Sequence, residues 1–284
     1  MEFKTLISVP GLAQYLNDPD WVVVDCRFWL DEPEKGQRDY RVSHIPGAVY
    51  AHLEKHLSAQ VVKGKTGRHP LPDMDTLASL FSAWGIGAHT QVVAYDDRGG
   101  MIAARLWWLL KWMGHKAAAV LDGGFPAWVA EGLAVTADLP EPEPAVFIPD
   151  PHEQMLVSEE DILSGFGDPG RLLVDSRAPE RFRGEIEPID PVAGRIPGAV
   201  NYFWGNNLDS KGYFEIKDIL RGRFTVMLMD IPAQNVTFYC GSGITAAHNV
   251  LAMAHAGMGM SKLYGGSWSH WITNPDLPIL TGSR

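Results

Sequence analysis

Cys240 is the residue of this sequence that is best placed to act as a nucleophile. It follows an apolar run that predicts a strand, and a helical pattern begins a few residues later. Between the two, Gly241 and Gly243 allow the backbone to turn its N–H groups toward the sulfur, and the start of the helix adds the positive end of its dipole. Such an anion-binding loop favours the thiolate, which is the reactive form of cysteine. Ser242 and Thr245 can contribute hydroxyl donors beside it.

The first half of the chain carries a comparable loop without a thiol. Tyr95 ends an apolar run as Tyr239 does, but the next residue is Asp96, and residues 97–100 continue as Asp-Arg-Gly-Gly. This loop cannot form a persulfide, so we expect one active and one silent copy. The other cysteine, Cys26, follows a predicted strand with no glycine loop or helix start behind it, which favours a packing role.

Four sequence signals recur in the same order in both halves, which indicates an internal duplication. Each half has an apolar run ending in Asp, an Ile-Pro-Gly-Ala-Val segment, an apolar run ending in Tyr, and a Gly-Gly pair followed by Trp. The paired ranges are 22–25 with 172–175, 45–49 with 196–200, 92–95 with 236–239, and 121–124 with 263–266, the last closing with Trp128 and Trp271.

These repeated elements predict two α/β domains, each a parallel sheet flanked by helices. Short apolar strands alternate with helical segments such as 101–113 and 244–256, and this alternation is typical of parallel sheets covered on both faces. Five prolines in one acidic stretch mark an extended connector. We therefore predict a catalytically silent first domain over 1–138, a proline-rich linker over 139–151, and a catalytic second domain over 152–284.

Both halves, together with the loop at 240–245, resemble the tandem rhodanese-domain sulfurtransferases. The loop reads Cys-Gly-Ser-Gly-Ile-Thr and is similar to the Cys-Gly-Ser-Gly-Val-Thr loop of the 3-mercaptopyruvate sulfurtransferases in this family, whereas thiosulfate-specific members carry basic residues at its second and third positions. The resemblance implies that sulfur passes from 3-mercaptopyruvate to a thiol or cyanide acceptor through a persulfide on the cysteine. It assigns catalytic roles to Cys240, Ser242 and Thr245, and places Gly241, Gly243 and Ile244 in the substrate site.

The family holds the substrate carboxylate with two arginines, and this sequence matches one of them. Arg181, in an Arg-Phe-Arg-Gly segment, is the match. At the second position a Glu-Pro pair is followed by Ile189 and Asp190 rather than by arginine. Two other arginines are candidates to replace it. One is Arg183, and the other is Arg195, which stands before Ile-Pro-Gly-Ala where histidine is usual.

Residues ahead of the cysteine loop extend the candidate site. His44 stands directly before the first Ile-Pro-Gly-Ala segment, where the family has a histidine near the loop serine. The resemblance therefore implies a relay from Ser242 to His44, with Asp39 as the candidate acid. The alternative for His44 is that it only caps a turn. Arg68 and His69, in a loop bounded by prolines, either face the substrate cleft or are structural.

Several other functions are disfavoured. Phosphatases of the related Cys-x5-Arg type need an arginine where this chain has Ala246. The histidines and cysteines show no paired metal-ligand spacing, and no nucleotide-binding glycine loop is present, so we expect neither a metal nor a cofactor. A thiosulfate sulfurtransferase and a non-enzymatic sulfur-relay or binding module are the alternatives.

Composition and charge limit the partners. The net charge of -10 disfavours nucleic acid, because phosphate binding needs a basic surface. No apolar run approaches the roughly 20 residues of a membrane span, and residues 1–16 lack a signal-peptide pattern. With only two cysteines, we expect a cytoplasmic protein. The resemblance implies as partners a small-molecule sulfur donor, a thiol or cyanide acceptor and a thioredoxin-like reductant.

Overall fold

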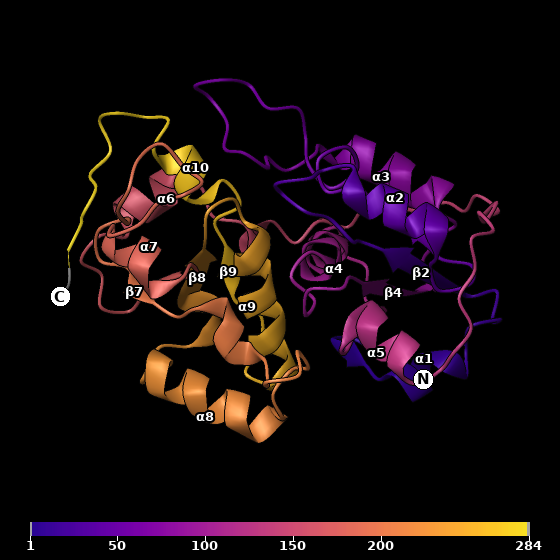
Figure 1. The fold of residues 1–284 in the computed structure, drawn as a ribbon. Helices are drawn as coiled ribbons and strands as arrows, with labels where there is room; N and C mark the ends of the chain where they lie inside the picture. Colours follow the sequence, from indigo (N-terminus) through magenta and orange to yellow (C-terminus); the bar gives the residue numbers. More distant parts are fainter. Residues whose placement is uncertain (1, 283–284) are drawn as a thin grey trace. The chain divides into compact units, whose positions relative to one another are not determined.

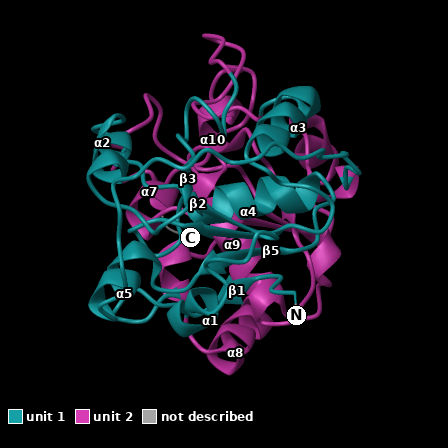
Figure 2. Ribbon diagram, turned by 90° about the vertical axis from the view of Figure 1, so that its right-hand side faces the viewer, with its two compact units in different colours: residues 1–59, 72–152, 208–214 teal, residues 60–71, 153–207, 215–284 magenta. Residues whose placement is uncertain are grey.

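The computed structural model describes residues 2–282, which form two compact units (Figure 2). Unit 1 consists of residues 1–59, 72–152 and 208–214, and unit 2 of residues 60–71, 153–207 and 215–284. Each unit therefore includes a short segment from the other half of the sequence. The domain boundaries inferred from the sequence stay a prediction. Residues 139–151 form no helix or strand, and they belong to unit 1.

Unit 1 is built around a parallel sheet whose described strands follow the order β1-β5-β4-β2-β3. In Figure 1, α1 and α5 lie on one side of β2 and β4, and α2 and α3 lie on the other. The elements are β1 (Leu6–Ile7), α1 (Val9–Ala13), β2 (Trp21–Asp25), α2 (Lys35–Val42), β3 (Val49–Tyr50), α3 (Met74–Ala83), β4 (Gln91–Tyr95), α4 (Ala103–Trp112), β5 (Ala118–Leu121) and α5 (Gly124–Ala130).

Unit 2 repeats this plan around a parallel sheet of order β7-β6-β8-β9 in the described residues. Helix α9 packs on β8 and β9, and α8 packs on α9 (Figure 1). The elements are η1 (Glu153–Met155), α6 (Glu159–Ser164), β6 (Leu172–Asp175), α7 (Pro179–Arg183), β7 (Val200–Asn201), η2 (Trp204–Asn207), α8 (Lys217–Leu228), η3 (Ala233–Asn235), β8 (Val236–Tyr239), α9 (Ile244–His255), β9 (Lys262–Leu263) and α10 (Ser267–Trp271).

The parallel sheets and flanking helices expected from the sequence are confirmed. The strand predicted at 172–175 coincides with β6, and the helix predicted at 244–256 ends one residue earlier in α9. The helix expected from residue 101 begins at Ala103, where the N–H groups of Ile102 and Ala103 donate to the carboxylate of Asp96. No described helix is both long and apolar enough to cross a membrane.

A buried ion pair stands at the carboxyl end of an inner strand in each unit. Asp25 ends β2 and binds Arg27 at 2.7 Å, while Asp175 ends β6 and binds Arg177 at 2.6 Å. Burial raises the pKa of Asp25, although the hydrogen bond from Arg27 opposes that shift. In unit 2, Arg177 also reaches Glu187 at 3.2 Å. The pair therefore ties the end of β6 to the segment that follows α7.

Candidate active site

The cysteine predicted as nucleophile lies in a tight connection between β8 and α9. Cys240 follows the last residue of β8 and is 2% exposed. The N–H of Gly243 donates a hydrogen bond to its Sγ at 3.2 Å. Gly243 has φ of 80°, a left-handed conformation that favours glycine, and it forms the N-cap of α9. The sulfur thus sits before the positive end of a 12-residue helix.

The carbonyl groups of the loop point away from the sulfur because the start of α10 binds them. The N–H of Trp268 donates to the carbonyl of Cys240 at 3.0 Å, and that of Ser269 donates to the carbonyl of Gly241 at 2.8 Å. The N–H of Cys240 donates to Oγ of Ser267 at 3.1 Å. Because both carbonyl groups are bound by α10, the N–H groups of the loop can face an anion.

Ser267 is a positioning residue that the sequence reasoning missed. It is fully buried and has φ of 55°, a conformation that costs energy for any residue with a side chain. The equivalent bond in unit 1 runs from the N–H of Phe125 to the carbonyl of Asp96, so Ser267 corresponds to Gly124. The two Gly-Gly pairs are therefore offset by one residue, which hid this serine from the sequence comparison.

Two arginines converge on Gly241. A Cβ added to this glycine would lie 3.0 Å from Nη2 of Arg68 and 3.4 Å from Nη2 of Arg181. Arg68 belongs to the 60–71 segment of unit 2, and its N–H donates to Oγ of Ser269 at 3.0 Å. Arg181, the arginine matched from the sequence, lies in α7. A small anion beside Cys240 would therefore meet two guanidinium groups.

Carboxylates behind the arginines fix their direction. Asp190 binds both guanidinium groups, Arg68 through Oδ1 and Arg181 through Oδ2, the latter at 3.0 Å. Glu187 binds Arg181 at 2.7 Å. Burial raises the pKa of Glu187, but the hydrogen bond and charge of Arg181, together with the N–H groups of Asp190 and Ile189, outweigh it and the net shift is downward. Asp190, in the Ile189-Asp190 pair that follows Glu-Pro, thus braces two arginines.

The hydroxyl of Ser242 has a histidine partner, and it is His69. Nδ1 of His69 lies 2.7 Å from Oγ of Ser242, and both side chains are buried. The relay expected through His44 stays a prediction. In unit 1 the two ring nitrogens of His44 lie 2.7 Å from the carbonyl of Tyr40 and 3.1 Å from that of Asp138. Those contacts match the alternative in which His44 holds a turn.

Other predicted site residues are engaged elsewhere or add little to the loop. Asp39, the candidate acid, binds Lys35 one helical turn away. Arg183 pairs with Glu185 at 2.7 Å at the surface. Arg195 donates to the carbonyl of Gly282 at 2.8 Å and stacks over Phe182. Ile244 is buried at the start of α9, and Thr245 is half-buried in its first turn.

The second cysteine contrasts with the first in its surroundings. Cys26 is fully buried in unit 1, where its Sγ lies 3.8 Å from the carbonyl oxygen of Val24. Burial, reinforced by Asp25 and Asp96, raises the pKa of the Cys26 thiol well above its usual value. A thiol in this environment stays protonated and is a poor nucleophile.

The loop after β4 in unit 1 holds a carboxylate where the other loop holds sulfur. Oδ1 of Asp96 accepts hydrogen bonds from the N–H groups of Arg98 and Gly100, at 2.8 and 2.9 Å. Oδ2 accepts from Ile102 and Ala103, at 2.7 and 2.9 Å. The anion-binding amides of this loop are therefore occupied by the chain itself. Among the described residues no group of His, Cys, Asp and Glu is arranged to hold a metal.

Comparison with known proteins agrees with this geometry. Residues 8–131 and 158–274 match the Rhodanese family, described as a rhodanese-like domain. The chain is 47% identical over 99% of its length to the whole of a probable 3-mercaptopyruvate sulfurtransferase of Pseudomonas aeruginosa. It is 37% identical over 99% of its length to a putative thiosulfate sulfurtransferase of Mycobacterium tuberculosis, covering 98% of that protein.

A solved structure extends the comparison to three dimensions. The structure of SseA from Escherichia coli, titled as a 3-mercaptopyruvate sulfotransferase, superimposes with a TM-score of 0.81 at 28% identity, covering 94% of this chain and all of that one. Two matching segments and relatives of this identity over nearly the full length establish the family. The chain belongs to the rhodanese family and is a sulfurtransferase.

Proposed function

We propose that this enzyme takes sulfur from 3-mercaptopyruvate and passes it, through a persulfide on Cys240, to a thiol or to cyanide. The observation that carries the proposal is the convergence of Arg68 and Arg181 on Gly241, the residue directly after the cysteine. A guanidinium binds a planar carboxylate through paired hydrogen bonds. Mercaptopyruvate carries its carboxylate several bonds from its sulfur, so the two arginines can hold that end while the sulfur lies at Cys240.

The first half-reaction transfers sulfur from 3-mercaptopyruvate to Cys240. The Cys240 thiolate forms a bond to the donor sulfur, and the carbon–sulfur bond breaks with its electron pair going to the carbon. Pyruvate leaves as its enolate and takes up a proton, while the cysteine keeps the sulfur as a persulfide. The hydroxyl of Ser242, 2.7 Å from His69, is the group we assign to that developing oxyanion or to its proton.

The second half-reaction returns the enzyme to its starting state. An acceptor thiolate or cyanide attacks the outer sulfur, and the sulfur–sulfur bond breaks with its electron pair returning to Cys240. The first amides of any helix lack intrahelical acceptors, so the start of α9 can hold the charged outer sulfur in between. Gly243 already directs one amide to Sγ. We include thioredoxin-like dithiols among the acceptors, and the two free cysteines suit the cytoplasmic location expected from the sequence.

The roles assigned to the arginines differ from those suggested by sequence alone. We propose Arg68, rather than Arg183 or Arg195, as the second carboxylate ligand, because its guanidinium group approaches Gly241, whereas Arg183 pairs with Glu185 at the surface and Arg195 binds the carbonyl of Gly282. Asp190 and Glu187 act as positioning residues for the pair. Thiosulfate is the competing donor, since two cations beside Cys240 also attract a sulfonate.

Steady-state kinetics with both donors and one acceptor tests this proposal. Charged hydrogen bonds contribute roughly 1.5–3 kcal/mol, so Arg68→Ala and Arg181→Ala should each lower kcat/KM for 3-mercaptopyruvate about tenfold to a hundredfold. We expect a smaller loss with thiosulfate. Arg183→Ala, whose side chain pairs with Glu185 at the surface, is the matched control and should change neither value. Equal losses with both donors, or a higher kcat/KM for thiosulfate in the unmodified enzyme, would contradict mercaptopyruvate as the donor.

A further inference from the structure

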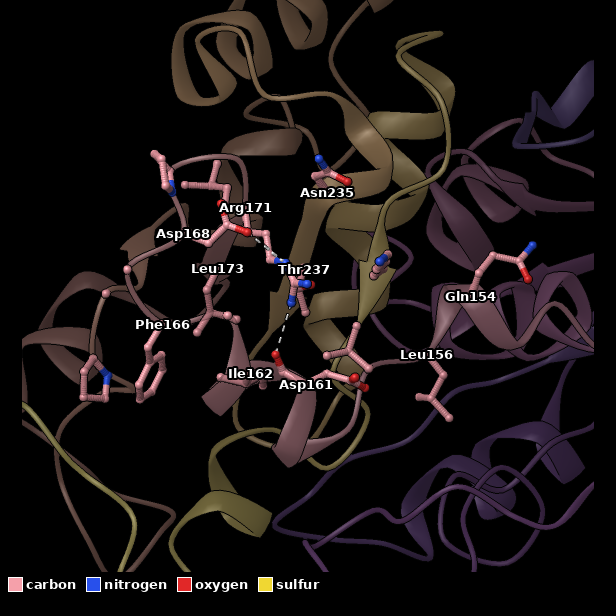
Figure 3. Close-up of a pocket in the computed structure, with 18 residues that line it drawn as sticks. Gln154, Leu156, Asp161, Ile162, Phe166, Asp168, Arg171, Leu173, Asn235 and Thr237 are labelled. Atoms are coloured by element: carbon pink, nitrogen blue, oxygen red, sulfur yellow. Dashed lines mark hydrogen bonds and ion pairs between the residues drawn. The ribbon is translucent and has the colours of Figure 1, made fainter.

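Unit 2 has a cavity of about 600 Å³ at the amino ends of its strands (Figure 3). Leu173 of β6, Thr237 of β8 and Lys262 of β9 contribute to its lining, together with Ile162 of α6 and the half-exposed ring of Phe166. Cys240 follows the carboxyl end of β8, three residues beyond Thr237, which at about 3.3 Å per residue is roughly 10 Å along the strand. The cavity is therefore separate from the cysteine loop.

The matching place in unit 1 is filled by three aromatic rings. Tyr15 stacks on Trp21 with ring centroids 4.4 Å apart, and Phe3 meets both rings edge-on, at 6.5 and 5.8 Å. Phe3 and Trp21 also pack against the apolar core of unit 1. The corresponding position in unit 1 therefore accommodates three aromatic side chains.

The sheet registers identify which residues replace them in unit 2. Val23, Val93 and Ala119 form one row across the sheet of unit 1, and Leu173, Thr237 and Lys262 form the same row in unit 2. The N-caps Ser8 and Ser158 align the segments ahead of that row. On this alignment Glu153, Gly165 and Arg171 stand in place of Phe3, Tyr15 and Trp21.

The charges around the cavity favour an anion. Asp161 is used in the capping box of α6, where its carboxylate accepts from the N–H and the hydroxyl of Ser158. Asp168 binds the N–H of Gly170 and the guanidinium of Arg171 (Figure 3). The ammonium group of Lys262, by contrast, makes no hydrogen bond or close ion pair with a described residue, and it acts on the carboxylate of Asp161 only at longer range, where its charge adds to the hydrogen bonds from Ser158 that lower the pKa of Asp161. Because the carboxylate of Asp161 is already bound by Ser158, the ammonium group of Lys262 stays available to a ligand in the cavity.

We propose that this cavity binds a small organic anion with an aromatic or similarly flat apolar body. The body would occupy the space that three rings fill in unit 1, against Ile162, Leu173 and Phe166. The anionic group would bind the ammonium of Lys262, with Arg171 at the rim. This site is distinct from the one that receives the sulfur donor, and its occupant is neither donor nor acceptor in the transfer reaction.

Calorimetric titration of the full chain with 2-naphthoate tests this site. We expect saturable binding of one equivalent, and binding about tenfold weaker both for Lys262→Ala and for the neutral analogue 2-naphthalenemethanol, because a charged hydrogen bond at a partly open site is lost. Lys262→Ala installs the residue that unit 1 has in this row. Arg171→Trp, which installs the unit 1 ring, should fill the cavity and abolish binding. Lys217→Ala, at the exposed start of α8, is the control and should leave binding unchanged.

Three results would overturn the proposal. One is unchanged naphthoate affinity in Lys262→Ala. This result would exclude a role for the ammonium group whether or not the Arg171→Trp chain folds. Another is displacement of naphthoate by pyruvate, which would move the binding to the cysteine loop. The third is tighter binding of the cationic analogue 2-naphthylmethylammonium, which would assign the cavity to the carboxylates of Asp161 and Asp168. None of these readouts depends on the identity of the sulfur donor.

Discussion

The loop after β4 in unit 1 and the loop after β8 in unit 2 both turn backbone N–H groups toward a single side chain. In unit 1 the side chain is Asp96, whose carboxylate accepts four of these N–H groups. In unit 2 it is Cys240, whose sulfur accepts one, from Gly243. The two loops differ in length, since α4 begins at Ala103 and α9 at Ile244, but both direct amides at their first residue, which is a resident carboxylate in unit 1 and a thiol open to an incoming donor in unit 2. A duplicated loop can lose or gain chemistry through the residue at its first position.

The largest difference in sulfur-transfer activity is expected between variants of the two cysteines, one in each unit. Cys240→Ser should abolish sulfur transfer from any donor, because the anion-binding loop contains no other thiol. Cys26→Ser should retain most of the activity, since burial keeps that thiol protonated. Thiocyanate formation with cyanide as acceptor measures both. Substantial turnover by Cys240→Ser would break the distinction between the two units.

A second, smaller loss is expected at the histidine beside the active loop. General acid–base groups contribute typically about a hundredfold to ten-thousandfold, so His69→Ala should lower kcat with 3-mercaptopyruvate by at least about a hundredfold. His44→Ala, in unit 1, should leave kcat within about threefold, because its ring nitrogens bind local carbonyls. The reverse order of effects would restore the relay through His44.

The resident anion of unit 1 should matter for folding instead of catalysis. Asp96→Asn replaces a carboxylate that accepts four N–H groups by an amide that cannot accept all of them. Leaving buried donors unsatisfied costs about 1–3 kcal/mol each, and the losses are not additive. We expect the free energy of unfolding to fall by about 2–4 kcal/mol, measured by urea denaturation, with the KM for the donor unchanged. A stable Asp96→Asn chain would show that unit 1 does not need this anion.

Replacing the neighbouring Asp97 should raise the free energy of unfolding, whereas replacing Asp96 should lower it. Its Oδ1 is buried without a hydrogen-bond partner, and burial, reinforced by Asp96, raises the pKa of Asp97 from 3.8 to about 6. A raised pKa means that the folded state holds the proton longer, so stability is lost as pH rises from about 4 through 6. Asp97→Asn should remove that loss and stabilise the chain at pH 8 by about 1–2 kcal/mol, allowing for partial exposure. Parallel unfolding curves at pH 4 and pH 8 measure the difference.

The chemistry of the cysteine loop could be predicted from sequence because its signals are local. Cys240 and the two glycines that follow stand within four residues, and the strand and helix around them have clear apolar patterns. The second arginine could not be identified this way. Arg68 lies more than a hundred residues from Cys240 in the chain and reaches the loop because residues 60–71 belong to unit 2. The absence of an arginine after Glu-Pro likewise did not predict that Asp190 binds two other arginines.

The most direct test of the account is the site of the sulfur adduct after one half-reaction. The unmodified enzyme is treated with 3-mercaptopyruvate without acceptor, its thiols and persulfides are alkylated, and its peptides are analysed by mass spectrometry. We predict one added sulfur atom on the peptide that contains Cys240 and none on the peptide that contains Cys26. An adduct on Cys26, or pyruvate release with no sulfur on Cys240, would contradict the persulfide mechanism.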